Sequence, residues 1–129
     1  MERDIVIIAG FGCRAGATPA SLRSALALTG ARDVTALAAP SDRAHLLMPV
    51  AEALGLTLIP LAPDILSGVE TPTRSPTSLA TRGTGSVAEA AALAAAGPGA
   101  RLLVTRRIAP DRMATCAIAA ASSCPEARS

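Results

Sequence analysis

Cys13 is the side chain of this sequence best suited to nucleophilic chemistry. It stands between Gly12 and Arg14, shortly before a predicted helix start at Thr18. A neighbouring guanidinium and a helix N-terminus both lower the pKa of a thiol, and the thiolate is the form that attacks an electrophile. A base is also needed, and the one histidine, His45, lies on a predicted helix where it points away from the apolar stripe. The competing interpretation is that Cys13 is a small residue that fills a loop.

Glu89 is a second catalytic candidate, as a general acid or base at the start of a helix. It is the last residue of the sequence Ser-Val-Ala-Glu, which begins at Ser86. This spacing is typical of a capping box, in which the two side chains bind backbone N–H groups of the first helical turn. A capping box accounts for Glu89 without catalysis, so a structural and a catalytic interpretation both stay open.

Arginine supplies all 12 basic side chains, and several of them follow predicted strands or precede helix starts. Guanidinium groups bind carboxylate or phosphate in a bidentate manner. We expect an anion-binding site where they meet hydroxyl groups and backbone amides at a helix N-terminus. The residues predicted to line it, besides the glycines discussed next, are Cys13, Arg14, Arg74, Ser75, Arg82, Thr84, Gly85, Ser86, Glu89 and Arg106. Solvated surface arginines are the alternative interpretation.

Three glycines follow the first predicted strand, Ile5–Ala9, whose continuous apolar run is expected to be covered on both faces. Gly10, Gly12 and Gly16 are predicted to form a ligand-contacting loop, because glycine lets a ligand approach the backbone closely. A tight strand-to-helix turn is the structural alternative. The pattern Gly10-x-Gly12-x-x-Ala15 also meets the looser dinucleotide fingerprint. However, no acid follows the second predicted strand directly, and the chain has no lysine for a P-loop, so a nucleotide-binding module is the weakest alternative.

The elements that must position these side chains are defined by caps, helix-ending glycines and apolar periodicity. Helices are predicted over 19–29, 42–54 and 87–96, and strands over 5–9, 34–39, 56–61, 101–105 and 113–119. Pro49 predicts a kink in the second helix or a helix start close to it, since an interior proline costs about 3 kcal/mol. Residues 62–85 are predicted to be a binding loop and 106–112 the turn of an antiparallel hairpin. The order predicts an α/β fold in one domain over 1–121, with a frayed tail over 122–129.

Composition excludes several classes of function. The only aromatic residue is Phe11, which leaves almost no means of stacking on nucleic-acid bases. The formal net charge of +2 is too small for an electrostatic nucleic-acid or membrane footprint. The 3 cysteines include no C-x-x-C pair, which argues against a zinc ribbon or a disulfide framework. We therefore predict a cytoplasmic protein with no metal or cofactor, which binds neither nucleic acid nor a membrane.

Several motifs together resemble those of the family formed by CobE and the C-terminal domain of CbiG, proteins of cobalamin biosynthesis. They are the Gly-x-Gly-Cys-Arg-x-Gly run over 10–16, Ser75-Pro76, and the block Thr-Gly-Ser-Val-Ala-Glu-Ala-Ala-Ala-Leu over 84–93. The Leu-Leu-Val and Ala-Ile-Ala ends of the last two strands agree as well. The motifs occur in the family's order and spacing, and the resemblance spans nearly the whole chain.

The resemblance implies a three-layer α/β/α domain with a mixed, mostly parallel sheet of about five strands. It also implies that the ligand is a precorrin or hydrogenobyrinic-acid-like tetrapyrrole, bound to assist the aerobic pathway. CbiG, which has further domains, opens a lactone on a cobalt-precorrin and releases acetaldehyde, so an enzyme acting on a precorrin side chain is the alternative. A free-standing domain like this one is more similar to CobE. Other corrin-pathway enzymes and a second copy of the chain are candidate partners.

The chain departs from the family's pattern at two places. The family commonly carries a lysine after its second strand, where this chain has Pro40-Ser41-Asp42. It carries another near the end of its fourth strand, where this chain has Arg106 and Arg107. The second change keeps the positive charge, whereas the first puts any lysine-dependent contact in doubt. Because precorrins are polycarboxylates, the remaining arginines still suit them, and the near absence of aromatic residues favours recognition through the acid side chains.

Overall fold

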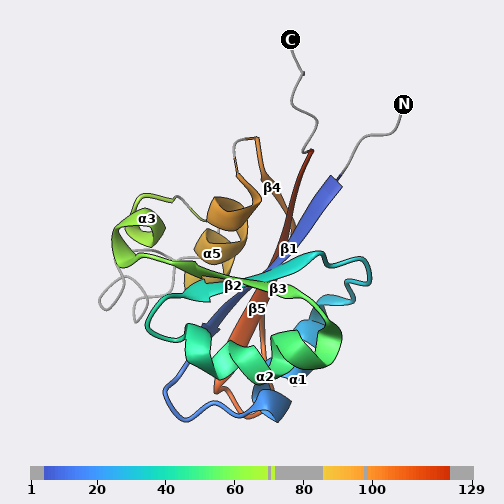
Figure 1. Cartoon of the computed structure of the whole chain (residues 1–129), viewed down its shortest axis with the longest axis vertical. Coiled ribbons are helices and arrows are strands. Elements are labelled where there is room, and N and C mark those ends of the chain that lie inside the picture. Colours follow the sequence, from blue (N-terminus) through green and yellow to red (C-terminus); the bar gives the residue numbers. More distant parts are fainter. Residues whose placement is uncertain (1–4, 70, 72–85, 98, 123–129) are drawn as a thin grey trace.

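A five-stranded mixed sheet in the order β3-β2-β1-β5-β4 forms the centre of the protein (Figure 1). The computed structural model describes residues 5–69, 71, 86–97 and 99–122. The strands are β1 (Ile5–Cys13), β2 (Ala36–Pro40), β3 (Thr57–Leu61), β4 (Arg101–Ile108) and β5 (Ala114–Ser122). The pairs β1/β2 and β2/β3 are parallel, whereas β1/β5 and β4/β5 are antiparallel. The predicted α/β class with a mixed sheet is confirmed.

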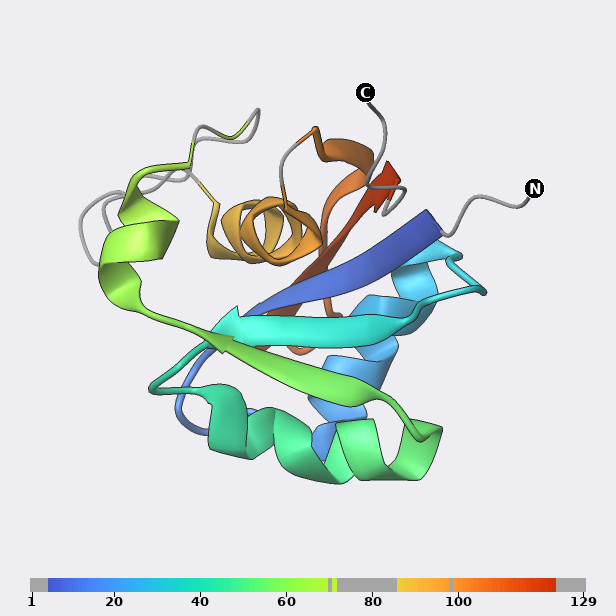
Figure 2. The same ribbon diagram turned by 45° about the horizontal axis from the view of Figure 1, so that its top comes forward.

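Helices cover both faces of the sheet and give the three layers that were expected (Figure 2). On one face lie α1 (Pro19–Thr29) and α2 (Ala44–Leu54), and on the other lie α3 (Pro63–Ser67) and α5 (Val87–Ala96). Each face has its own core. The core beneath α1 and α2 includes Phe11, Leu22, Leu37, Leu47 and Ile118, and the core beneath α3 and α5 includes Ile8, Leu61, Leu66, Ala90 and Ala91.

Local signals place the start and end of α1 where they were predicted. The Thr18 side chain accepts a hydrogen bond from the backbone N–H of Ser21, and Pro19 is the first helical residue. Gly30 ends the helix with a φ of 72°, a conformation that glycine adopts without strain. In α2, by contrast, the helix begins at Ala44 and contains Pro49 in its interior, so its start does not lie close to the proline.

The segment after β3 is partly helical, which corrects the prediction of a loop over 62–85. Residues Pro63–Ser67 form α3, with proline at the first position and Asp64 in the first turn, both of which favour a helix start. A helix of one turn leaves little periodicity in a sequence. Residues 70 and 72–85 lie outside the described residues. β3 is an edge strand, a position that suits its Pro60, because proline has no N–H to donate to a neighbouring strand.

The predicted C-terminal hairpin is present, and both of its strands are longer than expected. β4 contains irregularities in its pairing with β5: Val104 pairs with Ile118 and Arg107 with Cys116, so β4 has an extra residue in this interval. β5 includes Ser122, which was expected in the tail, and residues 123–129 lie outside the described residues. None of the described helices is long and apolar enough to span a membrane.

β1 is also longer than predicted, because it continues through the glycines to Cys13. Gly10 pairs with Ala117 and Gly12 with Thr115 of β5. The prediction of a loop at Gly10 and Gly12 is therefore wrong. These glycines are strand residues, and the turn into α1 begins after Cys13.

The reason for a glycine at position 10 lies in the packing of α5. A Cβ placed on Gly10 would lie 2.3 Å from the carbonyl oxygen of Ala88 and 2.3 Å from the backbone nitrogen of Ala92. The backbone of α5 thus crosses directly against the backbone of β1. The alanine-rich sequence of α5 and the missing side chain on β1 are two parts of one close contact.

Candidate functional site

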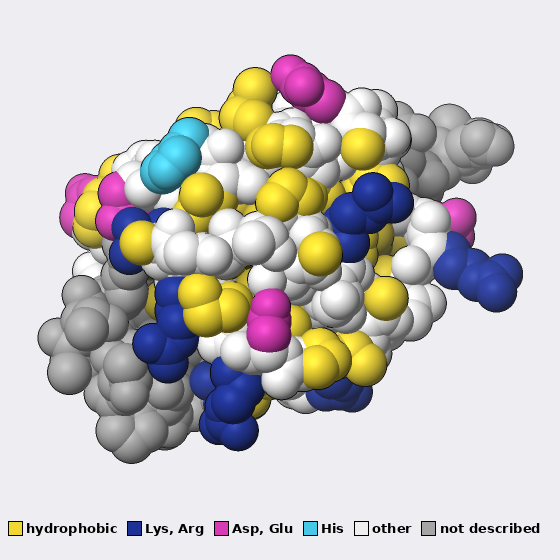
Figure 3. Space-filling view, turned by 90° about the horizontal axis from the view of Figure 1, so that it is seen from below, with side chains coloured by type: hydrophobic (Ala, Val, Ile, Leu, Met, Phe, Trp, Pro, Cys, Tyr) yellow, Lys and Arg dark blue, Asp and Glu magenta, His cyan; other side chains and the backbone are white. Residues whose placement is uncertain are grey.

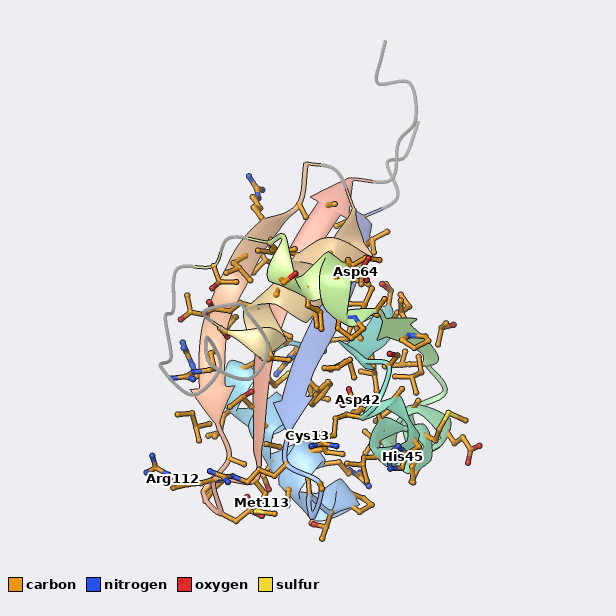
Figure 4. The ribbon with its side chains drawn as sticks, turned by 90° about the vertical axis from the view of Figure 1, so that its left-hand side faces the viewer. Cys13, Asp42, His45, Asp64, Arg112 and Met113 are labelled. Carbon is orange, nitrogen blue, oxygen red and sulfur yellow. The ribbon has the colours of Figure 1, made fainter. Side chains whose placement is uncertain are left out.

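The carboxyl ends of β1, β2 and β3 point to one edge of the sheet, which we call the carboxyl edge. Figure 4 looks onto this edge: Cys13 ends β1, Asp42 follows β2, and His45 lies in the first turn of α2. Arg112 and Met113, in the turn between β4 and β5, border the same edge. In open α/β sheets, ligands bind outside the carboxyl ends of parallel strands. The carboxyl edge is therefore the candidate site.

The N-terminus of α5 lies against the end of β1. A Cβ on Gly12 would be 3.2 Å from the Cβ of Val87, the first residue of α5. Ser86, which is buried, caps this helix by accepting a hydrogen bond from the backbone N–H of Glu89 at 3.3 Å. A helix N-terminus carries a partial positive charge. The structure thus brings the predicted residues Gly12, Cys13 and Ser86 to one place.

The peptide between Cys13 and Arg14 is held from two sides. Its carbonyl oxygen accepts a hydrogen bond from Nε of Arg43 at 3.2 Å, and its N–H donates to the carbonyl oxygen of Met113 at 2.9 Å. The Arg14 side chain also donates from Nε to the carbonyl oxygen of Arg112 at 3.3 Å. The α2 start and the hairpin turn therefore fix the end of β1, and with it the exposed Arg14.

Arg43 is a residue of the carboxyl edge that was not predicted. It follows β2 and is the N-cap of α2. Its hydrogen bond to the Cys13 carbonyl spans 30 positions of the chain, and no local pattern signals such a contact. The one available signal for Arg43 was its position shortly after a parallel strand, because ligand-binding residues gather there in α/β proteins.

The Cys13 thiol lies half-buried at the end of β1. His45, its predicted base, is exposed on α2, and it stands at the surface of the face drawn in Figure 3. Within the described residues, no hydrogen bond joins these two side chains. The structure thus places Cys13 at the edge without forming a Cys-His pair.

Glu89 is fully buried and binds a neighbouring strand. Its Oε2 accepts a hydrogen bond from the backbone N–H of Arg106 at 2.9 Å. Arg106 lies in the irregular interval of β4, where the extra residue frees a backbone N–H from regular pairing. The bond from the Glu89 N–H to Ser86 supplies the predicted capping contact. Glu89 therefore joins the first turn of α5 to β4.

The other predicted ligand-binding residues differ in their positions. Gly16 is exposed in the turn before α1, and the side chain of Arg106 is half-buried on β4. Cys116, which had no predicted role, is buried on β5, and burial raises the pKa of its thiol far above the usual range. The predicted residues Arg74, Ser75, Arg82, Thr84 and Gly85 lie outside the described residues, as does Cys124.

The strand position of Gly10 and Gly12 also bears on the nucleotide alternative. The dinucleotide fingerprint needs its glycines in a turn, where backbone amides face the pyrophosphate. Here both glycines pair with β5, and the end of β2 offers buried Ala38 and Ala39 instead of an acid. This geometry does not provide the phosphate-binding turn of that fingerprint. Within the described part of the chain, no group of three or more His, Cys, Asp or Glu residues could hold a metal ion.

Asp111 orders the turn that supports Arg14, a role that was not predicted. Its Oδ2 accepts a hydrogen bond from the hydroxyl of the buried Ser21 at 2.5 Å, and its Oδ1 accepts from the backbone N–H of Met113 at 3.0 Å. The hydrogen bond from Ser21, followed by that from Met113, lowers the pKa of the Asp111 carboxyl. The carboxylate thereby ties the β4–β5 turn to the start of α1.

Asp111→Asn is expected to lower the stability of the fold most strongly near neutral pH. Because the folded state lowers the pKa, the carboxylate stabilises the fold above its unfolded pKa of about 3.9, and this contribution is lost as the pH falls through the lowered value. Urea unfolding between pH 2.5 and 7 should show the difference between wild type and variant shrinking below about pH 4. A difference independent of pH would contradict this assignment. Asp33→Asn, at an exposed aspartate before β2, is the control.

The family model described as Cobalamin synthesis G C-terminus matches residues 7–119. A search of curated proteins gave no match.

Three solved structures of similar fold are described as proteins of cobalamin biosynthesis. CobE, a protein from the cobalamin (vitamin B12) biosynthetic pathway, is 34% identical, with a TM-score of 0.81, over 92% of this chain and 93% of its own. The cobalamin biosynthesis protein chiG from Agrobacterium tumefaciens is 38% identical, with a TM-score of 0.65, over 88% and 97%. A cobalamin biosynthesis protein G homolog from Sulfolobus solfataricus shares the fold at 18% identity and a TM-score of 0.70, over 90% of this chain and 37% of its own.

Proposed function

The chain belongs to the Cobalamin synthesis G C-terminus family, and from this membership we propose that it binds a precorrin or hydrogenobyrinic-acid-like tetrapyrrole at the carboxyl edge. In this role it assists the aerobic route to the corrin ring in the cytoplasm. Other enzymes of the pathway would supply and remove the ligand. CobE and chiG, which are 34% and 38% identical in sequence to this chain, are both described as proteins of cobalamin biosynthesis, and this supports the proposal.

The observation that carries the proposal is the exposed guanidinium of Arg14 at the end of β1. Its backbone and its Nε are both held by the hairpin turn, which limits the entropy lost when the side chain binds a ligand. The N-terminus of α5 lies against the same strand end, so two sources of positive potential meet there. Figure 3 shows arginine side chains spread over its face, and some of them lie toward the left-hand end, to which β1 and β2 run. Such an edge suits the carboxylates of a tetrapyrrole.

Arg14→Ala is expected to weaken the binding of hydrogenobyrinic acid by about tenfold or more, because a charge-assisted hydrogen bond to a carboxylate is lost. The measurement is a titration followed by the visible absorption of the tetrapyrrole. Arg32→Ala, at an exposed arginine before β2 and thus at the opposite edge, is the matched control and should bind like wild type. A wild-type chain that produces no spectral change would refute the proposed function.

An enzyme acting on a precorrin side chain is the second candidate, and the half-buried thiol of Cys13 at the carboxyl edge favours it. A nucleophilic role predicts that Cys13→Ser and Cys13→Ala both lower turnover by orders of magnitude while tetrapyrrole binding persists. Complementation of a strain that lacks the gene, read as corrinoid yield, measures this. Unchanged yield with both variants would leave binding as the function and dismiss the thiol chemistry.

A further inference from the structure

The start of α2 does not explain why an arginine occupies position 43. Arg43 is the N-cap residue, with a φ of −117° and a ψ of −4°, and its side chain makes no capping hydrogen bond. Residues favoured at this position are Ser, Thr, Asp and Asn, whose short side chains accept hydrogen bonds from the first turn. Arginine has only donors and cannot serve in this way. A contact other than the helix cap must therefore explain the arginine at this position.

The side chain of Arg43 crosses from α2 to the end of β1. Its Nε donates to the carbonyl oxygen of Cys13 at 3.2 Å, which uses one of the five N–H donors of the guanidinium. Arg14 repeats this arrangement, with its Nε on the carbonyl oxygen of Arg112. Within the described residues, neither guanidinium has a carboxylate partner. Each guanidinium is thus tied by Nε to a backbone carbonyl, one at the end of β1 and the other in the β4–β5 turn beside it, and its outer N–H groups are left for a ligand.

We infer that Arg43 is a second carboxylate-binding residue of the carboxyl edge, acting with Arg14 on two acid side chains of one tetrapyrrole. The inference rests on the proposed function. Two like charges at one strand end repel each other, and an anion that contacts both removes this repulsion. Arg43 is half-buried, so its interaction with a carboxylate is screened less than that of an exposed arginine. A ligand with several carboxylate arms around a ring can reach two separate guanidinium groups at once.

The test compares Arg43→Gln and Arg43→Lys with wild type, Arg14→Ala and the control Arg32→Gln. Each is titrated with hydrogenobyrinic acid and with the same macrocycle after its carboxylates have been converted to amides. Gln removes the charge, whereas Lys keeps the charge but lacks the planar pair of donors. Circular dichroism checks that each variant is folded. If Arg43→Gln is not folded, the comparison of Arg43→Lys with wild type decides the question.

We expect Arg43→Gln to weaken binding of the acid by about tenfold or more while binding of the amide form changes by less than about twofold. Arg43→Lys should be intermediate for the acid and like wild type for the amide form. Equal losses for both ligands would show that Arg43 only holds the end of β1, and unchanged binding of both would show that it has no role, so either result overturns the inference. If Arg14→Ala weakens acid binding and Arg43→Gln does not, the inference alone fails. If wild type does not bind the acid, the proposed function fails with it.

Discussion

Gly10→Ala is expected to destabilise the domain strongly, although it adds only one methyl group. The new Cβ would lie 2.3 Å from the Ala88 carbonyl oxygen and from the Ala92 backbone nitrogen, whereas real Cβ atoms essentially never approach closer than 3.0 Å. Both neighbours are backbone atoms of α5, so no side-chain rotation can relieve the contact. The helix would have to move away from β1 as a unit, and its alanines would lose their packing against β1 and β5.

The cost of Gly10→Ala is about 3 to 5 kcal/mol, at the upper end of overpacking effects and a large part of the stability of a typical domain. Urea unfolding followed by circular dichroism measures it. Gly16→Ala is the matched control, because a Cβ there meets only the flexible end of Met113, at 3.2 Å, and should cost less than about 1 kcal/mol. A Gly10→Ala variant that unfolds at the wild-type urea concentration would show that α5 does not pack as described.

Glu89→Leu is expected to destabilise the protein by about 2 to 4 kcal/mol. The substitution leaves the backbone N–H of Arg106 without its acceptor, and a buried unsatisfied donor costs about 1 to 3 kcal/mol. The shape of the buried site changes as well, which adds a packing cost. Glu89→Gln keeps an oxygen that can accept the bond, so it should lose less stability than Glu89→Leu. Both values come from the urea unfolding of the purified variants.

The pair of Glu89 variants also separates a structural role from a catalytic one. If Glu89 acts only as the link between α5 and β4, Glu89→Gln should retain most of the corrinoid yield of a complemented strain, in step with its stability. A Glu89→Gln variant that is as stable as wild type but gives no corrinoid would assign the carboxyl to chemistry instead.

The parts of the fold that were predicted correctly are those with local causes. Thr18, Pro19 and Gly30 bound α1 through contacts within a few residues, and Ser86 likewise starts α5. The apolar run of β1 predicted a strand covered on both faces, and this holds for Ile8 and Ala9, which are buried, whereas Ile5 at its start is exposed.

The parts that were missed depend on residues far apart in the sequence. Glycines spaced like Gly10 and Gly12 also occur in ligand-binding loops, so the sequence alone does not separate the two cases. The pairing with β5 and the crossing of α5 show that they are strand residues under a helix. The contact of Arg43 with Cys13 depends on how β1 and β2 lie side by side. The hydrogen bond of Glu89 with Arg106 depends on an irregularity in β4 that no propensity signals. Sequence patterns thus indicated some of the residues that lie at the carboxyl edge, such as Cys13 and Arg14, and the packing decides what each one contacts.

The most direct test of the carboxyl edge as the tetrapyrrole site is a titration of the ¹⁵N-labelled chain with hydrogenobyrinic acid, observed through backbone amide resonances. If the tetrapyrrole binds at the carboxyl edge, the largest shifts are expected at Cys13, Arg14 and Val87, where the end of β1 meets α5, and Arg32 and Asp33 before β2 should remain unchanged. Shifts centred on Arg32 and Asp33, or no shifts at any amide, would contradict this assignment.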